Sequence, residues 1–131
     1  MAVLSIKTVF DPAFKGTLVT SRARVPVGDG EGALYPYDML LGALSSCFYS
    51  TFLDILEKKR VTIEAAELDV SGEKRTEVPT TLSWVTVRLT VRGASDRAAI
   101  ERSAELAGKY CSIYQTLSHV ATMKTEVAFA D

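Results

Sequence analysis

The chain has little cysteine, little histidine and no excess of charge of either sign. Its 131 residues include two cysteines and one histidine, and 15 Lys and Arg against 16 Asp and Glu give a formal net charge of −1. His119 stands alone, with no CxxC or HxxxH pair, so we predict no metal and no other bound cofactor. A balanced charge also argues against a nucleic-acid partner, because neutralising phosphates needs a clustered excess of Lys and Arg.

Long apolar runs and targeting signals are also missing. Residues 1–7 show no basic region followed by a long apolar one, so we expect no secretory signal. The longest charge-free apolar stretch, 39–53, has 15 residues and is shorter than the roughly 20 that a membrane-spanning helix needs. We therefore expect a cytoplasmic protein with no membrane partner. There, a lone cysteine pair is free, catalytic or redox-cycling more often than a structural disulfide.

The apolar pattern predicts one α+β domain over residues 1–131, with elements in the order βββ-α-ββ-αα-β. Strands that occur in runs favour mostly antiparallel pairing, and the first two strands are expected to form a hairpin. The predicted strands are 3–10, 17–20, 24–27, 61–70 (with an irregularity between 65 and 68), 82–91 and 123–129. The predicted helices are 36 to about 60, from a cap at Ser95 or Asp96 to about Gly108, and about 112–120.

The segment 39–53 is apolar nearly all the way round a helix. A helix without a polar face should be surrounded by protein. A chain of this length has little protein with which to enclose such a helix, so we expect a homodimer.

A glycine-rich segment follows the third predicted strand. Gly28, Gly30 and Gly32 are spaced as GxGxG, which differs from the dinucleotide-binding GxGxxG, and no βαβ unit surrounds them. We interpret the segment as a mobile loop.

The two cysteines are the candidate reactive groups. Cys47 lies well inside the first predicted helix, where a free cysteine is commonly a small buried hydrophobe. As a thiolate it would need positive charge from another segment, because burial raises a thiol pKa. Cys111 lies at a predicted helix start with Lys109 two residues before it, which should lower its pKa and suit it to a resolving or exchange role.

Two blocks around these cysteines resemble those of a known family. PYDMLLGALSSCF at 36–48 is similar to the "Pro-x-acid-Leu-Leu…Ala-x-x-x-Cys" helix of the OsmC/Ohr family, the osmotically inducible protein C and organic hydroperoxide resistance proteins. AELAGKYCSI at 104–113 resembles that family's second cysteine motif, and RTEVP at 75–79 fits ahead of a long strand. The resemblance extends over nearly the whole chain.

This resemblance implies antiparallel sheets packed around a long buried central helix, in an intertwined homodimer. It implies a thiol-dependent peroxidase that reduces small organic hydroperoxides. Cys47 would be the peroxidatic thiolate that becomes a sulfenic acid, and Cys111 would resolve that acid as an intramolecular disulfide. An external dithiol would then reduce the disulfide.

Two positions depart from the pattern of the peroxidatic members, and they place the chain closer to the OsmC-like side branch. Those members pair the thiolate with an arginine of the N-terminal hairpin, held by a glutamate ten residues before the cysteine. Here Lys15 is the cation of the hairpin, and it lacks the guanidinium fork. Tyr37 stands at the glutamate position. The candidate supporting residues are therefore Asp38, Lys15, Arg22 and Arg24.

These departures leave an alternative function open. The chain would then be a thiol-bearing protein that binds an apolar ligand, or handles thiol or sulfur transfer, at the dimer cleft. The aromatic residues Tyr35, Tyr37, Phe48 and Tyr49 are the candidates for lining such a cleft.

Overall fold

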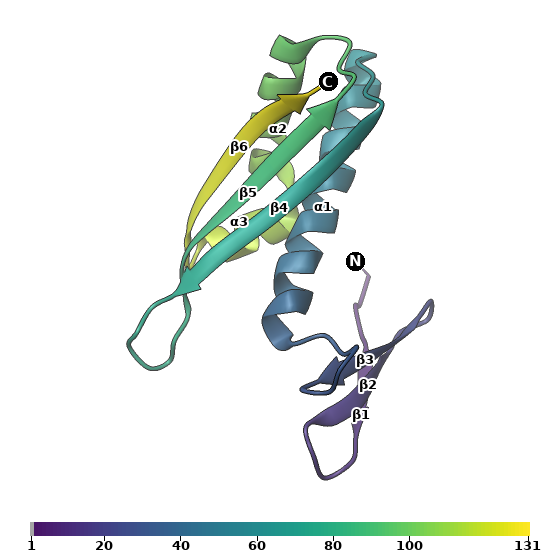
Figure 1. Cartoon of the computed structure of the whole chain (residues 1–131), viewed down its shortest axis with the longest axis vertical. Helices are drawn as coiled ribbons and strands as arrows, with labels where there is room; N and C mark the ends of the chain where they lie inside the picture. The colour runs from purple at the N-terminus through teal and green to yellow at the C-terminus, as the bar shows by residue number, and fades with distance from the viewer. Residues whose placement is uncertain (1) are drawn as a thin grey trace. The chain divides into compact units, whose positions relative to one another are not determined.

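The computed structural model describes residues 2–131, and its elements follow the predicted order (Figure 1). The α+β class is confirmed. The strands are β1 (Lys7–Phe10), β2 (Lys15–Val19), β3 (Arg24–Gly28), β4 (Ala65–Lys74), β5 (Leu82–Arg92) and β6 (Thr122–Ala130). The helices are α1 (Pro36–Lys59), α2 (Arg97–Tyr110) and α3 (Ser112–Ser118).

The described residues divide into two compact units, of which the first ends at Leu40. This unit holds the antiparallel sheet β1-β2-β3, and the predicted hairpin of β1 and β2 is confirmed. Strand β1 begins at Lys7 and not at residue 3, because pairing with β2 stops where β2 ends at Val19. After β3 the N–H of Gly28 donates to the carbonyl of Leu34 at 3.1 Å, which ties the two ends of the glycine-rich loop together.

The second unit, Leu41–Asp131, holds the sheet β4-β5-β6. Strands β4 and β5 form an antiparallel hairpin, whereas β6 runs parallel to β5. Two parallel neighbours cannot be joined by a tight turn, so the chain crosses over through α2 and α3, which cover one face of the sheet in Figure 1. The alternate residues Val85, Val87, Leu89 and Val91 of β5 are fully buried, as their alternation predicts.

The fourth strand begins later and ends later than its pattern indicates. Residues 61–64 connect α1 to the sheet, and the N–H of Thr62 is held by the hydroxyl of Ser95 at 3.0 Å. Pairing between β4 and β5 is regular from Ala65 onward, and the irregularity lies between Glu73 and Lys74. The predicted irregularity between residues 65 and 68 is therefore wrong.

Only one stripe of α1 is buried in the single chain. It consists of Leu44, Phe48, Phe52 and Leu56, one residue per turn, while Leu53 remains 41% exposed. In the single chain the second unit covers one face of this helix, and its enclosure by a second copy stays a prediction. By length and composition α1 could cross a membrane, with a mean hydropathy of 1.5 over 18 residues, a property that core helices of soluble proteins share.

Candidate active site

Cys111 lies at the junction of two helices. It is the C-cap of α2, where its N–H donates to the carbonyl of Ala107 at 2.8 Å, and it is also the N-cap of α3. Its extended backbone (φ −70°, ψ 116°) ends one helix and starts the next. Its sulfur accepts the N–H of Tyr114 at 3.4 Å, as the oxygen of a capping serine would. The predicted helix start at this cysteine is confirmed, and its side chain is fully buried.

The structure brings the two cysteines together. Both thiols are free, and Cys47 is half-buried on α1. The Cys111 thiol lies near the Cys47 sulfur, and the Cys111 thiol, the backbone and hydroxyl of Ser112 and the backbone N–H of Ile113 are the donors that lower the pKa of Cys47. The first residues of α3 are therefore directed at a sulfur that lies 64 positions earlier in the chain.

The two thiols have opposite acidities. Burial acts to raise the pKa of Cys47, but the hydrogen bonds from Ile113, Cys111 and Ser112 outweigh burial and hold that pKa below its ordinary value. Burial raises the pKa of Cys111, and the N–H of Tyr114 offsets it only in part. The bond that Cys111 donates to Cys47, together with the charge of that sulfur, raises it further. The prediction of a lowered pKa at Cys111 is therefore wrong, because burial and the neighbouring sulfur outweigh the helix start.

The donors that stabilise the Cys47 thiolate are uncharged. They belong to residues 111–113, so the thiolate receives from a helix start the support that we expected from a cation. Ser112 was not among the predicted site residues. Its signal in the sequence is its place directly after a cysteine at a predicted helix start, where both its hydroxyl and its N–H are available as donors.

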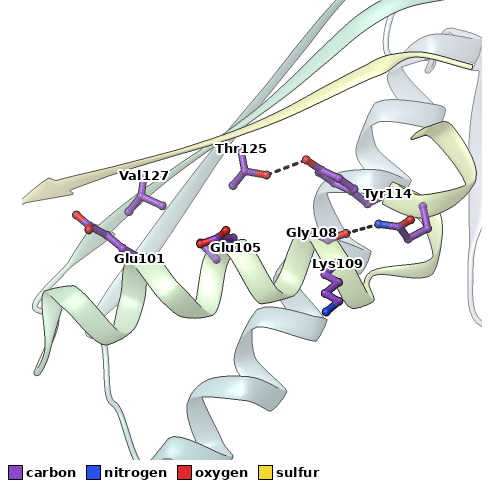
Figure 2. A pocket seen from close by; sticks show the side chains of 9 residues that line it. Glu101, Glu105, Gly108, Lys109, Tyr114, Thr125 and Val127 are labelled. Carbon is purple, nitrogen blue, oxygen red and sulfur yellow. Dashed lines mark hydrogen bonds between the residues drawn. The ribbon is translucent and has the colours of Figure 1, made fainter. Parts of the chain in front are cut away.

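Helix α3 is tied to its neighbours beside a pocket of about 520 Å³ (Figure 2). The Tyr114 hydroxyl and the Thr125 Oγ1 on β6 lie 3.1 Å apart and form a hydrogen bond. The Gln115 Nε2 donates to the carbonyl of Gly108 on α2 at 2.9 Å. The pocket is lined by Glu101, Ala104, Glu105, Gly108, Lys109, Tyr114, Gln115, Thr125 and Val127.

The predicted supporting residues all lie in the first unit. Lys15 begins β2, Arg24 begins β3 and Arg22 lies in the turn between those strands, each with an exposed side chain. The Asp38 Oδ2 accepts the N–H of Tyr35 at 2.9 Å, so this carboxylate caps the start of α1.

The aromatic residues considered for an apolar cleft make separate contacts. The ring of Phe48 is fully buried and lies 6.1 Å from that of Tyr114, whereas the ring of Tyr49 lies 6.2 Å from that of Phe52. In the first unit the ring of Tyr35 lies 6.3 Å from that of Phe14. Phe48 is thus a core residue and not a lining residue of the single chain.

The histidine of this sequence lies at the end of a helix. His119 is the exposed C-cap of α3, as predicted, and its N–H donates to the carbonyl of Thr116 at 3.4 Å. Among residues 2–131 no group of three or more His, Cys, Asp or Glu side chains is placed to hold a metal ion.

Comparison with known proteins agrees with this architecture. A family model described as OsmC-like protein matches residues 28–126. Protein YhfA of Escherichia coli K12 is 31% identical over 86 residues, which span 64% of this chain and 64% of YhfA, less than two thirds of that relative.

Solved structures share the fold. An OsmC-like protein from Mycoplasma pneumoniae superposes with a TM-score of 0.88 at 16% identity and 99% coverage of both chains. A Legionella pneumophila protein described as an organic hydroperoxide resistance protein OsmC gives 0.72 at 12% identity, with 98% of this chain and 99% of that one covered. These identities establish a shared fold alone. The family match covers most of the chain, and the chain belongs to the OsmC-like family.

Proposed function

We propose that this protein is a thiol-dependent peroxidase that reduces organic hydroperoxides, with Cys47 as the peroxidatic residue and Cys111 as the resolving one. The observation that carries the proposal is the unequal pair of thiols. Cys47 is partly exposed with a lowered pKa, and Cys111 is buried against it with a raised pKa. A thiolate, not a thiol, attacks a peroxide, so the pair has one nucleophile and one thiol held in reserve.

The reaction would proceed in two steps. The Cys47 thiolate attacks the distal oxygen of the hydroperoxide, the O–O bond breaks, Cys47 becomes a sulfenic acid and an alkoxide leaves. The alkoxide takes up the thiol proton of Cys111 and departs as an alcohol. The Cys111 thiolate then attacks the Cys47 sulfur, forming the disulfide and releasing hydroxide. In sum, a hydroperoxide, a thiolate and a thiol give an alcohol, a disulfide and hydroxide.

The cycle would be closed by a partner outside the chain. An external dithiol reduces the disulfide by thiol exchange and leaves as a cyclic or linear disulfide. We propose that no bound cofactor takes part and that the reaction takes place in the cytoplasm, in a homodimer. The OsmC-like family and the organic hydroperoxide resistance protein of the same fold support this assignment.

Peroxide-treated protein tests the proposal directly. The reduced protein is mixed with cumene hydroperoxide, and its free thiols and tryptic peptides are followed by mass spectrometry. We expect two thiols lost per hydroperoxide and a disulfide between the Cys47 and Cys111 peptides. In Cys111→Ser, dimedone should trap a sulfenic acid on Cys47, and Cys47→Ser should consume no peroxide. A wild-type protein whose thiols survive the treatment would refute the proposal.

The same thiol pair could serve sulfur transfer. The partly exposed, acidic Cys47 thiol is the observation that favours this second function, since a persulfide forms on a thiolate. A low-molecular-weight persulfide would serve as donor, since its outer sulfur passes to the Cys47 thiolate while its inner sulfur leaves as a thiol. A persulfide on Cys47 after this treatment, in protein that does not react with cumene hydroperoxide, would select sulfur transfer.

A further inference from the structure

We propose that Tyr114 and Thr125 are positioning residues for the Cys47 thiolate: their hydrogen bond holds α3 where its first residues reach the Cys47 sulfur. Neither residue touches that sulfur. Figure 2 shows the two side chains pointing toward one another between α3 and β6. The inference rests on the proposed function in taking Cys47 as the reactive thiol.

Helix α3 is too short to hold its own position. It has seven residues, none of them fully buried, and isolated helices of this length are marginal in water. Its donors to Cys47 nevertheless come from its first turn. The contacts that anchor α3 to the rest of the unit therefore decide where those donors lie.

Tyr114 makes more of these contacts than any other described residue of α3. Its backbone N–H donates to the sulfur of Cys111, and its ring lies 6.1 Å from that of Phe48, the residue after Cys47 on α1. Its hydroxyl reaches across to Thr125 on β6 at 3.1 Å. One residue thus connects the helix to the cysteine that caps it through its backbone, and to α1 and the sheet through its side chain.

The fit around this tyrosine is tight. A Cβ atom on Gly108 would lie 3.2 Å from the Tyr114 Cζ and 3.5 Å from the Thr125 Oγ1. The ring therefore lies directly against the backbone of α2, with a glycine at the closest point. A second tie, from the Gln115 side chain to the Gly108 carbonyl, holds the next residue of α3 to the same point.

Loss of the Tyr114–Thr125 bond should weaken the support of the thiolate. Hydrogen bonds weaken steeply with poor distance and angle, so a small shift of α3 reduces the donation from Ser112 and Ile113 to Cys47. The Cys47 pKa then rises, and a smaller share of the thiol is ionised at neutral pH. The alkylation rate at high pH, where the thiol is fully ionised, stays unchanged.

The test is the pH profile of alkylation of Cys47 by iodoacetamide, resolved by mass spectrometry of its peptide. It needs no peroxidase activity, so a protein that fails to reduce peroxides still reports on α3. Tyr114→Phe removes only the hydroxyl, and Thr125→Val is nearly isosteric. Each should slow alkylation at pH 7 about threefold, the effect of one modest hydrogen bond. Their combination should be no slower than either alone, because both remove the same bond.

Two control variants separate positioning from general damage. Thr125→Ser keeps the hydroxyl, so its pH profile of Cys47 alkylation should match that of the wild type. Tyr110→Phe makes the same chemical change in a tyrosine that is 64% exposed and next to Cys111, and it should leave the profile unchanged. Wild-type profiles in both Tyr114→Phe and Thr125→Val would overturn the proposal. Additive effects in the double variant, or an equal effect of Tyr110→Phe, would also overturn it.

Discussion

The Cys111 thiol lies beside Cys47 as a donor that lowers the pKa of Cys47, and the same Cys111 sulfur accepts the N–H of Tyr114 at 3.4 Å. One buried side chain therefore stabilises the neighbouring thiolate and also begins the helix that supplies the other donors. Substitutions at this position can separate those two effects from the capacity to form a disulfide.

Serine and alanine at position 111 should have different effects on Cys47. Cys111→Ser keeps an acceptor for the N–H of Tyr114 and a donor for Cys47, whereas Cys111→Ala loses both. We expect the alanine variant to lose about 1 kcal/mol of stability from the missing cap. Its Cys47 should also alkylate several-fold more slowly at pH 7 than in the serine variant. Urea denaturation and the alkylation profile measure the two effects, and equal behaviour of the variants would contradict the double role.

The stability of the reduced protein should increase with pH through the action of Cys47. Its folded-state pKa lies below the ordinary value of 9.0, so the folded protein loses this proton at a lower pH than the unfolded chain. The resulting stability is fully present above pH 9 and is lost as the pH falls through the folded-state pKa. Cys111, with its raised pKa, acts in the opposite direction above pH 9.

Urea denaturation of wild type and Cys47→Ser between pH 6 and 9, in the presence of a phosphine reductant, isolates this contribution. Titrating groups other than Cys111, whose pKa depends on the Cys47 charge, cancel in the difference between the two proteins. The difference in unfolding free energy, wild type minus variant, should grow with pH in this window. A difference that is independent of pH would show that Cys47 titrates alike in the folded and unfolded chains.

Gly108→Ala should slow the alkylation of Cys47 without lowering the stability of α2. Alanine favours a helix over glycine by up to about 1 kcal/mol. Its Cβ would lie 3.2 Å from the Tyr114 Cζ, so the ring must move by a few tenths of an ångström. We expect alkylation of Cys47 at pH 7 to slow about twofold, a fraction of one hydrogen bond. Gly42→Ala is the matched control, because a Cβ there meets no atom within 4 Å.

The exposed side of α1 predicts self-association. Leu53 is 41% exposed on a helix whose other face forms the core. Light scattering at micromolar concentration should give a dimer, and Leu53→Asp should shift it toward monomer because a charge is costly in an apolar interface. Val78→Asp, at a side chain that is 90% exposed beyond β4, should leave the dimer intact. A wild-type monomer would contradict the expectation.

Much of the secondary structure could be predicted from local patterns. The helix predicted from residue 36 to about 60 is α1, because its apolar run and its terminal Lys58 and Lys59 are readable in sequence. The buried face of β5 follows from strict alternation. The parallel direction of β6 could not be predicted from the sequence. Alternation of apolar and polar residues indicates which face of a strand is buried, but not in which direction the strand runs.

The site was predicted in part. The sequence indicated the two cysteines and the helix start at Cys111, but their acidities are the reverse of what local position favours. A helix start is visible in sequence, whereas the atom that its donors meet is decided by tertiary packing. The donors meet the Cys47 sulfur on α1. Because local sequence does not show this meeting, Ser112 was not predicted as a site residue.

The separation of the two cysteines along the chain has a thermodynamic consequence. The two cysteines lie near one another although they are 64 positions apart in the chain, and the segment between them contains β4, β5 and α2. A disulfide between them would close a large loop and reduce the conformational entropy of the denatured chain. This reduction would stabilise the folded protein by about 4 kcal/mol. Oxidation would thus crosslink most of the second unit. A protein that alternates between dithiol and disulfide would also alternate between a less stable and a more stable folded state.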